Sequence, residues 1–427
     1  MSDPALAALL LVQLIVVLAV CRGLGWMFAR VRQPLVVAEM IAGFLLGPSF
    51  FGWVAPDLQG RLFAPESKHT LFVLSQLGLV LYMFSVGLEF RTDLVTRYRR
   101  RAIGVSAAGI AAPFLFGGVL AAVMLRAGGF FTDSARPFHA VLFLGAAMSI
   151  TAFPVLARII SERGIAGTTI GSLSLAAGAM DDAAAWIIVA IVLSSFTGNA
   201  TLAMLAAGGA ALYVAVVFLG VRRLVAPLAA AAERADAVSP GTYVTILCLL
   251  ASGAWFTDFI GVHSVFGAFM LGVGMPRGVL TRDLRRHTEP LTMAILVPLF
   301  FVYSGLNTRL ALLDSTPLWL MTAAVFVTAC VAKGAACWAA ARLSGAPPRH
   351  ALAIGTLMNA RGMVELILAG IGLQRGLITP TLFAILVLMA IGTTVMTGPL
   401  FSLVWEREDE PAADWLEVRA SRREHSP

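Results

Sequence analysis

Apolar segments of about 20 residues follow one another along almost the whole of this 427-residue chain. A helix of about that length crosses the hydrocarbon core of a lipid bilayer. Hydrophobic residues make up 59% of the chain and charged residues only 13%, a balance that excludes a soluble globular domain. The sequence therefore predicts an all-α polytopic membrane protein with about thirteen transmembrane helices.

The apolar runs give the bounds of these helices. We expect them at Ala5–Cys21, Pro34–Val54, Thr70–Phe90, Ala102–Leu125, Pro137–Ile160, Gly167–Phe196, Thr201–Val221, Thr242–Phe256, Phe259–Met275, Leu291–Leu306, Pro317–Ala341, Ala351–Leu373 and Thr381–Trp405. Residues 1–405 thus form the expected transmembrane domain. Residues 406–427 are charged and lack apolar periodicity, so we expect a short solvated or disordered tail.

Arginines gather in the loops after the odd-numbered helices, as in Arg97–Arg101, whereas loops after even-numbered helices are nearly neutral, as in Thr197–Asn199. The positive-inside rule makes the arginine-rich loops cytoplasmic, with the N-terminus outside and the tail inside. This topology explains the formal charge of +7. The arginines are scattered over short loops, so the charge does not indicate nucleic-acid binding.

The four cysteines lie in apolar stretches without the spacing of a zinc or redox motif, and we interpret them as packing residues. The sequence shows no phosphate loop, haem motif or nucleophile–base set, so we expect neither a cofactor nor an enzymatic reaction. The start, Met1–Pro4, lacks the basic region of a cleaved signal peptide. The first apolar run is therefore expected to remain as a helix.

Asp181 and Asp182 stand near the middle of an apolar run, Ile170 to Ser195, that contains no other ionisable residue. An Asp at the centre of a spanning helix costs about 2.5 to 3.5 kcal/mol even on the mildest scale, so the pair indicates a transport or proton site. Adjacent helix positions point about 100° apart, so one acid can meet a basic partner while the other faces an ion pathway. Burial beside a like charge favours proton binding, so a proton and a metal ion would compete there. The alternative is that both acids lie in water at a helix end.

Lys333 is one of only two lysines and lies inside an apolar run, remote from any loop. A lone buried ammonium is costly, so we expect it to pair with one of the two aspartates. The alternative is that its side chain reaches the cytoplasmic face, although it would cover only part of the roughly 13 Å of helix before Arg342.

The segments 145–152 and 355–362 are similar to each other and belong to the expected fifth and twelfth helices. Seven steps separate these helices, so the two copies would run in opposite directions, as in the inverted repeats of secondary transporters. Chance similarity between two helices rich in small residues is the alternative.

Both repeat helices are expected to be interrupted. Pro154 has no backbone donor and frees carbonyl groups near Thr151, while Asn359 and Gly362 weaken the twelfth helix at the same depth. Two crossing broken helices would present carbonyl oxygens and the hydroxyls of Ser149 and Thr151 as ligands for a hard cation beside the aspartates. A simple kink in each helix is the alternative.

Three further charged residues lie in apolar segments. Arg361 and Glu365 are four residues apart and can neutralise each other across one turn, which would compensate charge at the break in the twelfth helix. Direct contact of this pair with the ion is the alternative. Glu39 lies near a helix start, where the helix dipole favours an acid, and is a candidate for lining an access funnel.

Several ordered motifs resemble those of the monovalent cation:proton antiporter-2 family, over about residues 34–399. They are Val37–Ser49, Phe153–Glu162, the aspartate pair followed by Ala185-Trp186, Tyr303–Leu306 and Met358–Ile367. The resemblance implies a homodimer with a sodium/proton antiporter fold and two crossing broken helices. It also implies a core domain, here roughly residues 102–196 and 317–405, that moves against a fixed dimerisation domain.

The same resemblance implies a role for each site residue. Asp182 would be the main carrier of cation and proton, Asp181 would pair with Lys333, and Thr151 would lie beside the ion at the crossing. The cation ligands expected are thus Asp182, Asp181 and Thr151, and this double-aspartate form is associated with electrogenic exchange.

The buried acids, the lone lysine and the paired broken helices together predict a secondary antiporter. It would exchange H⁺ for Na⁺ or K⁺ by alternating access, in a bacterial inner membrane and in the service of pH homeostasis. One alternative is a cation channel in which the acids line a continuous pore. Another is a sodium-coupled organic-anion transporter in which Arg361 binds a carboxylate.

Overall fold

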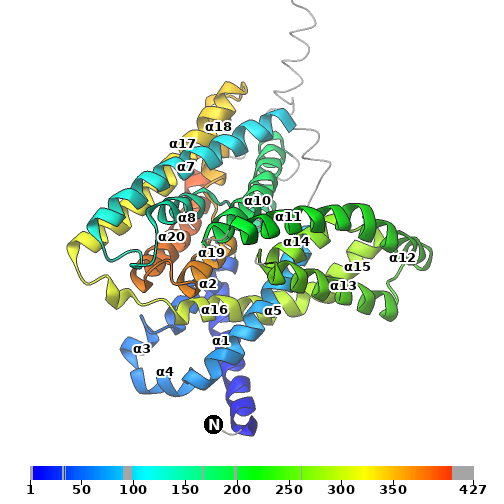
Figure 1. Cartoon of the computed structure of the whole chain (residues 1–427), viewed down its shortest axis with the longest axis horizontal. Helices are drawn as coiled ribbons and strands as arrows, with labels where there is room; N and C mark the ends of the chain where they lie inside the picture. Colours follow the sequence, from blue (N-terminus) through cyan, green and yellow to red (C-terminus); the bar gives the residue numbers. More distant parts are fainter. Residues whose placement is uncertain are drawn as a thin grey trace, which may run out of the picture. The chain divides into compact units, whose positions relative to one another are not determined.

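The computed structural model describes residues 3–30, 33, 35–89, 99–165, 168–196, 200–260 and 262–405, coloured along the sequence in Figure 1. Across these ranges the regular structure is helical, apart from one isolated bridge between Phe131 and Ile378. The expected tail, residues 406–427, and two segments used to predict orientation, 91–98 and 197–199, lie outside the described residues. The all-α membrane fold class predicted from the sequence is confirmed.

Nine helical segments within the described ranges are long and apolar enough to cross a membrane. The remaining expected spans correspond to two interrupted helices, one 28-residue helix and one 11-residue helix, all bounded below. The total of thirteen crossings stays a prediction.

The chain divides into two compact units. The first unit draws its described residues from 1–31, 35–90 and 186–312. Its elements are α1 (Asp3–Arg30), α2 (Leu35–Leu46), α3 (Phe51–Val54), α4 (Pro56–Leu62), α5 (Pro65–Glu89), α11 (Ala200–Ala215), α12 (Arg222–Ala235), α13 (Pro240–Phe259), α14 (Ser264–Gly274), α15 (Val279–Leu291) and α16 (Val297–Leu306), with the π-helical segments η1 (Val216–Val221) and η2 (Thr292–Leu296) and the 3₁₀ turn η3 (Leu310–Leu312).

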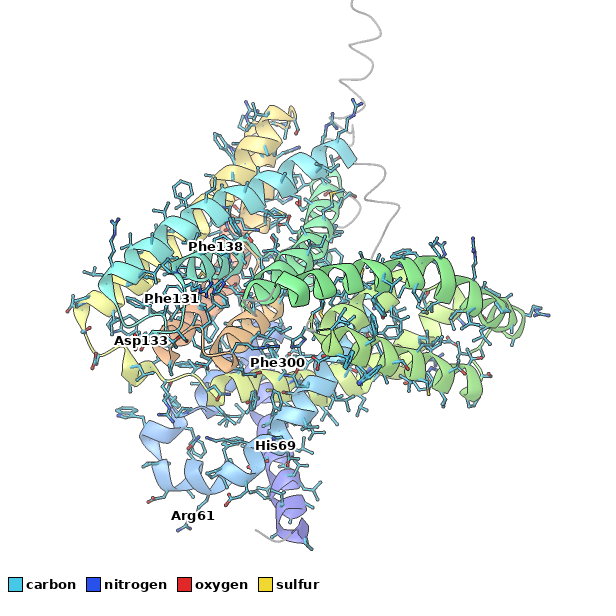
Figure 2. All side chains as sticks on the ribbon, in the orientation of Figure 1. Arg61, His69, Phe131, Asp133, Phe138 and Phe300 are labelled. Atoms are coloured by element: carbon cyan, nitrogen blue, oxygen red, sulfur yellow. The ribbon has the colours of Figure 1, made fainter. Side chains whose placement is uncertain are left out.

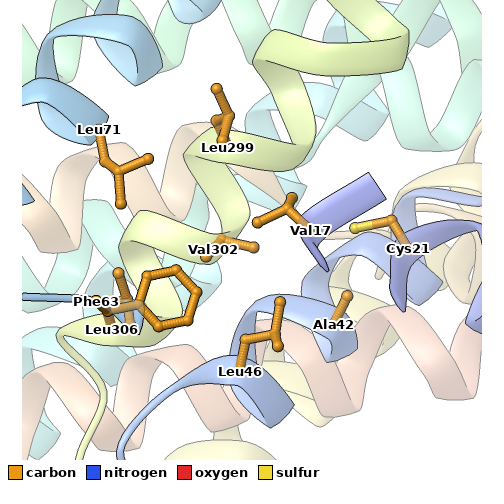
Figure 3. Close-up of a cluster of buried hydrophobic side chains, with 9 residues drawn as sticks. All are labelled: Val17, Cys21, Ala42, Leu46, Phe63, Leu71, Leu299, Val302 and Leu306. Carbon is orange, nitrogen blue, oxygen red and sulfur yellow. The ribbon is translucent and has the colours of Figure 1, made fainter. Parts of the chain in front are cut away.

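A cluster of buried apolar side chains holds α1, α2, α5 and α16 of this unit together. Figure 3 shows Val17 and Cys21 of α1 facing Ala42 of α2 and Val302 of α16. Phe63, just after α4, closes the cluster and is 2% exposed. Burying such side chains is favourable at about 25 cal/mol per Å² of apolar surface, so this cluster holds the middle of α1 against the rest of the unit.

Helices α2 and α16 approach each other closely through glycines. A Cβ atom at Gly43 would overlap the carbonyl of Phe301, and one at Gly305 would overlap the carbonyl of Gly43. Small residues allow this backbone contact between membrane helices. The glycines of the Val37–Ser49 and Tyr303–Leu306 motifs therefore serve packing within the first unit.

Several expected boundaries were wrong. Helix α1 continues to Arg30 instead of ending at Cys21, although Gly23 and Gly25 have low helix propensity, and Arg22 and Arg30 therefore lie in the helix and not in a loop. The seventh expected helix likewise continues beyond Val221, through α12 to Ala235. The second expected span agrees in extent with the apolar segment Leu35–Val54, but it is interrupted inside, with α2 ending at Leu46 before Gly47-Pro48, as expected where proline disfavours helix in the residue before it. Helix α13 includes Phe259, which we had expected to begin the next helix.

The second unit draws its described residues from 33, 99–185 and 313–405. Its helices are α7 (Arg99–Ala127), α8 (Pro137–Ser149), α9 (Phe153–Glu162), α10 (Thr169–Phe196, as far as Ala185), α17 (Thr316–Leu343), α18 (Pro348–Leu357), α19 (Met363–Gln374) and α20 (Pro380–Val404). Helices α7 and α17 lie side by side (Figure 1). The predicted interruptions are present between α8 and α9 and between α18 and α19.

The connection that precedes the first interrupted pair, α8 and α9, meets the connection that follows the second pair, α18 and α19. Thr132 donates its amide hydrogen to the carbonyl of Leu377 at 3.1 Å, and Thr379 donates to the carbonyl of Phe130 at 3.0 Å. Phe131, labelled in Figure 2, lies between these bonds in the loop that leads to α8. The pairing ties the start of the first interrupted helix to the end of the second.

Candidate ion site

The candidate site lies in the second unit, where α10 carries both aspartates in mid-helix. Asp181 is 1% exposed and Asp182 is fully buried. Helix α10 has no break at this position, so the two side chains leave the helix in different directions. They meet different neighbours, which are described in turn.

Lys333 of α17 is fully buried and forms an ion pair with Asp181. Its Nζ donates to Asp181 Oδ2 at 3.2 Å, to the carbonyl of Gly109 at 3.0 Å and to the carbonyl of Ser149 at 2.5 Å. An ammonium group has three hydrogens, so these three acceptors satisfy it completely. The structure therefore brings together the two charges that the sequence predicted as a pair.

The Asp181 carboxylate is held through one oxygen. Oδ2 accepts the hydrogen bond from Lys333 and a second one from Thr151 Oγ1 at 2.5 Å. Oδ1 has no hydrogen-bond partner among the described residues. Because Thr151 gives its only hydrogen to Asp181, the lone pairs of its hydroxyl oxygen remain free to face a cation.

Asp182 faces the start of α9 instead. Its Oδ1 accepts a long hydrogen bond, 3.4 Å, from the amide of Phe153, the first residue of α9. The N-terminus of a helix carries partial positive charge and attracts an anion. Oδ2 has no partner in the part of the chain that the structure describes, so this carboxylate keeps one oxygen for a proton or a cation.

The two interruptions cross at the same place. Residues Ile150 to Ala152 separate α8 from α9, and Met358 to Gly362 separate α18 from α19. The amide of Ala152 donates to the carbonyl of Ala360 at 3.0 Å, which joins the two breaks directly. Both helices are thus interrupted, as predicted, and neither has only the simple kink that was the alternative.

Pro154 is the second residue of α9. Proline is tolerated in the first turn of a helix, where its missing N–H would have no partner in any case. It therefore helps to begin the second half-helix, directly after the break at Ile150 to Ala152 where freed carbonyls were predicted.

Ser149 contacts the site through its backbone. Its hydroxyl donates to the carbonyl of Ala146 at 2.9 Å, one turn back in α8, and its carbonyl accepts from Lys333. The hydroxyl oxygen as an ion ligand stays a prediction. Sequence reasoning missed Gly109, whose carbonyl also accepts from Lys333, because an isolated glycine in a helix carries no functional signal.

Arg361, in the second break, is fully buried and reaches the end of α8. Its Nη1 donates to the carbonyl of Ala147 at 3.2 Å and its Nη2 to the carbonyls of Met148 at 2.6 Å and Ala329 at 3.4 Å. The last carbonyls of a helix have no hydrogen-bond donors within that helix. The guanidinium of Arg361 donates hydrogen bonds to two of them. Arg361 therefore connects the second break to the end of the first half-helix, beyond the charge compensation predicted for it.

Glu365 lies one turn further along and is also fully buried, with its Oε2 3.6 Å from Arg361 Nη1. Neither carboxylate oxygen has a hydrogen-bond partner among the described residues. The side-chain amide of Asn359 donates to the carbonyl of Gly355 at 3.2 Å, while its Oδ1 is without a partner in the described ranges. Both residues therefore lie where the sequence placed them, beside the second break.

Five ionisable side chains of this site are buried together within the second unit: Asp181, Asp182, Glu365, Lys333 and Arg361. With all five ionised, three negative and two positive charges leave one negative charge in excess. A proton or one monovalent cation would neutralise it. Among the described residues, no group of three or more His, Cys, Asp or Glu side chains lies together as metal ligands would.

Glu39 belongs to the other unit. It lies on α2 and is 6% exposed, where it lines a cavity of about 660 Å³ within the first unit. Its predicted place in an access funnel stays a prediction.

Comparison with known proteins finds a matching family model and several similar proteins. Residues 14–407 match the family model described as "Sodium/hydrogen exchanger, transmembrane". The chain is 38% identical to the Na(+)/H(+) antiporter NhaS4 of Synechocystis, over 92% of this chain and 96% of that protein. It is 36% identical to the cation/H(+) antiporter 17 of Arabidopsis thaliana and 31% identical to the K(+)/H(+) antiporter 1 of Saccharomyces cerevisiae, and it spans about half the length of each of these two.

Among solved structures, the sodium proton antiporter MjNhaP1 of Methanocaldococcus jannaschii at pH 8 is similar, with a TM-score of 0.62 over 93% of this chain and 97% of that chain. The sequence identity is only 16%, so this likeness concerns the fold. The family match and the relatives confirm the resemblance that the motifs indicated. The chain belongs to the sodium/hydrogen exchanger family of monovalent cation:proton antiporters.

Proposed function

We propose that the protein exchanges protons for Na⁺ or K⁺ across a membrane by alternating access, with Asp182 as the main carrier. The observation that carries this proposal is the fully buried Asp182 carboxylate, which keeps one oxygen without a partner among the described residues beside the N-terminus of α9. The names of the relatives include Na⁺/H⁺ and K⁺/H⁺ antiporters, which supports both ions as substrates.

A proton and a cation exclude each other at this carboxylate. Protonation of Asp182 removes one negative charge from the five buried groups, and binding of one monovalent cation to the ionised form offsets one as well. A site that is less negative when loaded than when empty crosses a low-dielectric region more easily when loaded. This condition couples the outward movement of one ion to the inward movement of the other.

Coordination of the cation would use Asp182, Asp181 and the hydroxyl oxygen of Thr151. Asp181 Oδ1 is without a partner in the described chain, and Thr151 Oγ1 lies 2.5 Å from the other oxygen of the same carboxylate. Hard monovalent cations prefer such oxygen ligands. Arg361 and Glu365 would hold the broken helices and stay out of the ion's own coordination.

The stoichiometry depends on Lys333. If the lysine keeps its proton, one H⁺ exchanges for one cation and no net charge moves. If the cation displaces Lys333 from Asp181 and the ammonium releases its proton, two H⁺ exchange for one cation. We propose the second, electrogenic course, which rests on the ion pair of 3.2 Å between Lys333 and Asp181.

The two units suggest a division of labour. We propose that the second unit, which holds all the site residues except Glu39, is the moving core, and that the first unit is the fixed scaffold of a homodimer. For the cellular setting we propose a bacterial inner membrane, with the N-terminus outside and the tail in the cytoplasm, on the basis of the arginine-rich loops.

An organic-anion transporter is less well supported, because Arg361 already donates to three carbonyl oxygens and lies 3.6 Å from Glu365. A carboxylate substrate would have to displace these contacts.

The test is proton flux in proteoliposomes under imposed Na⁺ or K⁺ gradients, at several clamped membrane potentials. Wild-type protein is expected to show cation-dependent flux that Asp182→Asn abolishes, and its voltage dependence distinguishes the two stoichiometries. Full coupled flux in Asp182→Asn would contradict the proposal. Cation current without proton movement would establish a channel instead.

A further inference from the structure

The cavity in the first unit has mainly apolar walls. It has a volume of about 660 Å³ and is lined by α1, α2 and the segment from the end of α15 through η2 to α16. Eight of its ten lining residues are apolar or cysteine, among them Leu18, Leu35 and Met293. Pockets for small molecules are typically about 300 to 1,000 Å³, so the space suits a flexible apolar chain.

The inner wall of this cavity is firmly packed. Cys21 belongs both to the wall and to the buried cluster of Figure 3, where it faces Ala42. The wall is therefore continuous with a cluster of buried side chains and is not a loose gap between helices.

Two of the lining residues are charged, and they differ in exposure. Arg22 of α1 is exposed, whereas Glu39 of α2 is 6% exposed. The positive group is therefore the one that an incoming ligand meets from outside.

The exposed face of α1 continues this positive charge away from the cavity. Arg22, Trp26 and Arg30 are each four residues apart, so they share one face of the helix with Leu18. The Arg30 guanidinium lies 3.6 Å from the centre of the Trp26 ring, and Trp26 is 66% exposed. Arg22 and Arg30 together outweigh Glu39 by one positive charge.

The length of α1 explains where this face lies. Its 28 residues extend over about 42 Å at about 1.5 Å per residue, whereas the hydrocarbon core of a bilayer is about 30 Å thick. The last turns of the helix thus lie at the level of the lipid headgroups, where tryptophan and arginine are favoured.

We propose that this cavity binds one acyl chain of an anionic phospholipid, whose phosphate contacts Arg22 and Arg30. The apolar walls accept the chain, and the exposed arginines favour a headgroup with net negative charge over a zwitterionic one. The lipid would bridge α1 and the α15–α16 segment within the first unit. The proposal concerns binding only and does not depend on the transport reaction.

The test uses the full-length purified protein in neutral detergent with added phosphatidylglycerol or phosphatidylcholine of the same acyl chains. The lipid retained by each protein is measured by intact-protein mass spectrometry over a range of lipid concentrations. Wild-type protein is expected to retain phosphatidylglycerol in preference to phosphatidylcholine. Arg22→Gln is expected to weaken that binding about fivefold, as for one arginine near an anionic lipid surface.

Two matched variants serve as controls. Arg234→Gln removes an exposed arginine of the same unit, whose side chain bonds to the carbonyl of Ala230 on its own helix, and is expected to bind as wild type. Ala294→Phe fills the cavity and is expected to lower the retention of both lipids. Its control is Val244→Phe, at a residue of α13 that is 57% exposed, which is expected to retain both lipids as wild type does.

Equal retention of the two lipids by wild type, or unchanged binding in both Arg22→Gln and Ala294→Phe, would overturn the proposal. A change of oligomeric state in Ala294→Phe with unchanged lipid retention would also overturn it and would assign the cavity to an interface between two copies.

Discussion

Replacement of Arg361 by methionine tests the role assigned to the second break. The change removes two hydrogen bonds to the last carbonyls of α8, a third to Ala329 and the 3.6 Å ion pair with Glu365. It also leaves the Glu365 carboxylate fully buried without its ion-pair partner. Breaking a buried pair in this way costs about 3 to 5 kcal/mol, so we expect Arg361→Met to lower the free energy of unfolding by about 4 kcal/mol.

Glu365→Gln is expected to lower the free energy of unfolding by less than Arg361→Met does. Arg361 keeps its three carbonyl acceptors in that variant, so its charge remains hydrogen-bonded. In the double variant Arg361→Met/Glu365→Gln neither charge is left alone. The double variant is therefore expected to be more stable than the sum of the single effects predicts, by about 2 kcal/mol, within the range of about 0.5 to 3 kcal/mol for contacting residues.

The assay is reversible unfolding in mixed detergent micelles, followed by tryptophan fluorescence. If unfolding is irreversible, its rate at a fixed temperature replaces the equilibrium free energy. Arg375→Met, at an exposed arginine just after α19, is the matched control and is expected to change little. Strict additivity of the two single variants, or a cost below about 1 kcal/mol for Arg361→Met, would refute the reasoning.

Three further predictions concern neighbouring contacts. Thr151→Val removes the hydroxyl that lies 2.5 Å from Asp181 and is expected to raise the cation concentration for half-maximal flux about threefold to tenfold. Thr151→Ser keeps a hydroxyl and is expected to stay near wild type. The same cation concentration for half-maximal flux in both variants would contradict a role for the hydroxyl oxygen. Lys333→Met leaves Asp181 buried without the ammonium group that pairs with it and is expected to lower the free energy of unfolding by about 3 to 5 kcal/mol in the same assay. Adding Asp181→Asn is expected to recover much of that loss. The control Lys68→Met is expected to leave the free energy of unfolding nearly unchanged. Gly305→Val places a Cβ against the carbonyl of Gly43 and is expected to lower the free energy of unfolding by about 1 to 3 kcal/mol. The control is Gly60→Ala, because nothing lies within 4 Å of a Cβ atom at Gly60. Equal melting temperatures for the two variants would disprove the close contact of α2 and α16.

The sequence was most informative where a residue conflicts with its surroundings. Asp181, Asp182 and Lys333 are charged groups in apolar runs, and the cost of burying a charge predicts that such groups find one another. The two breaks were predicted for a similar reason, because proline and glycine weaken a helix in its interior. These features follow from local chemistry, so one sequence suffices to find them.

The hydrogen-bond acceptors of Lys333 and Arg361 could not be predicted, because these are backbone carbonyls of residues that do not conflict with their apolar surroundings. Gly109 supplies only a carbonyl, and its position opposite Lys333 depends on how α7 packs against α17. The reach of Arg361 to Ala147 and Met148 depends in the same way on how the breaks cross. Helix ends were also less well predicted, as α1 shows, since this helix continues through Gly23 and Gly25 although glycine has low helix propensity.

The hydrogen bond between Ala152 and Ala360 has a consequence for biosynthesis. A chain is made and inserted from its N-terminus, so both aspartates enter the membrane long before Lys333, Arg361 and the second break exist. Until more than 150 further residues have been synthesised, Asp181 has no lysine to pair with and the first break has no backbone partner. The nascent protein therefore carries its acids unpaired, in neutral protonated form or in contact with water. The ion site is completed only when the last third of the chain arrives.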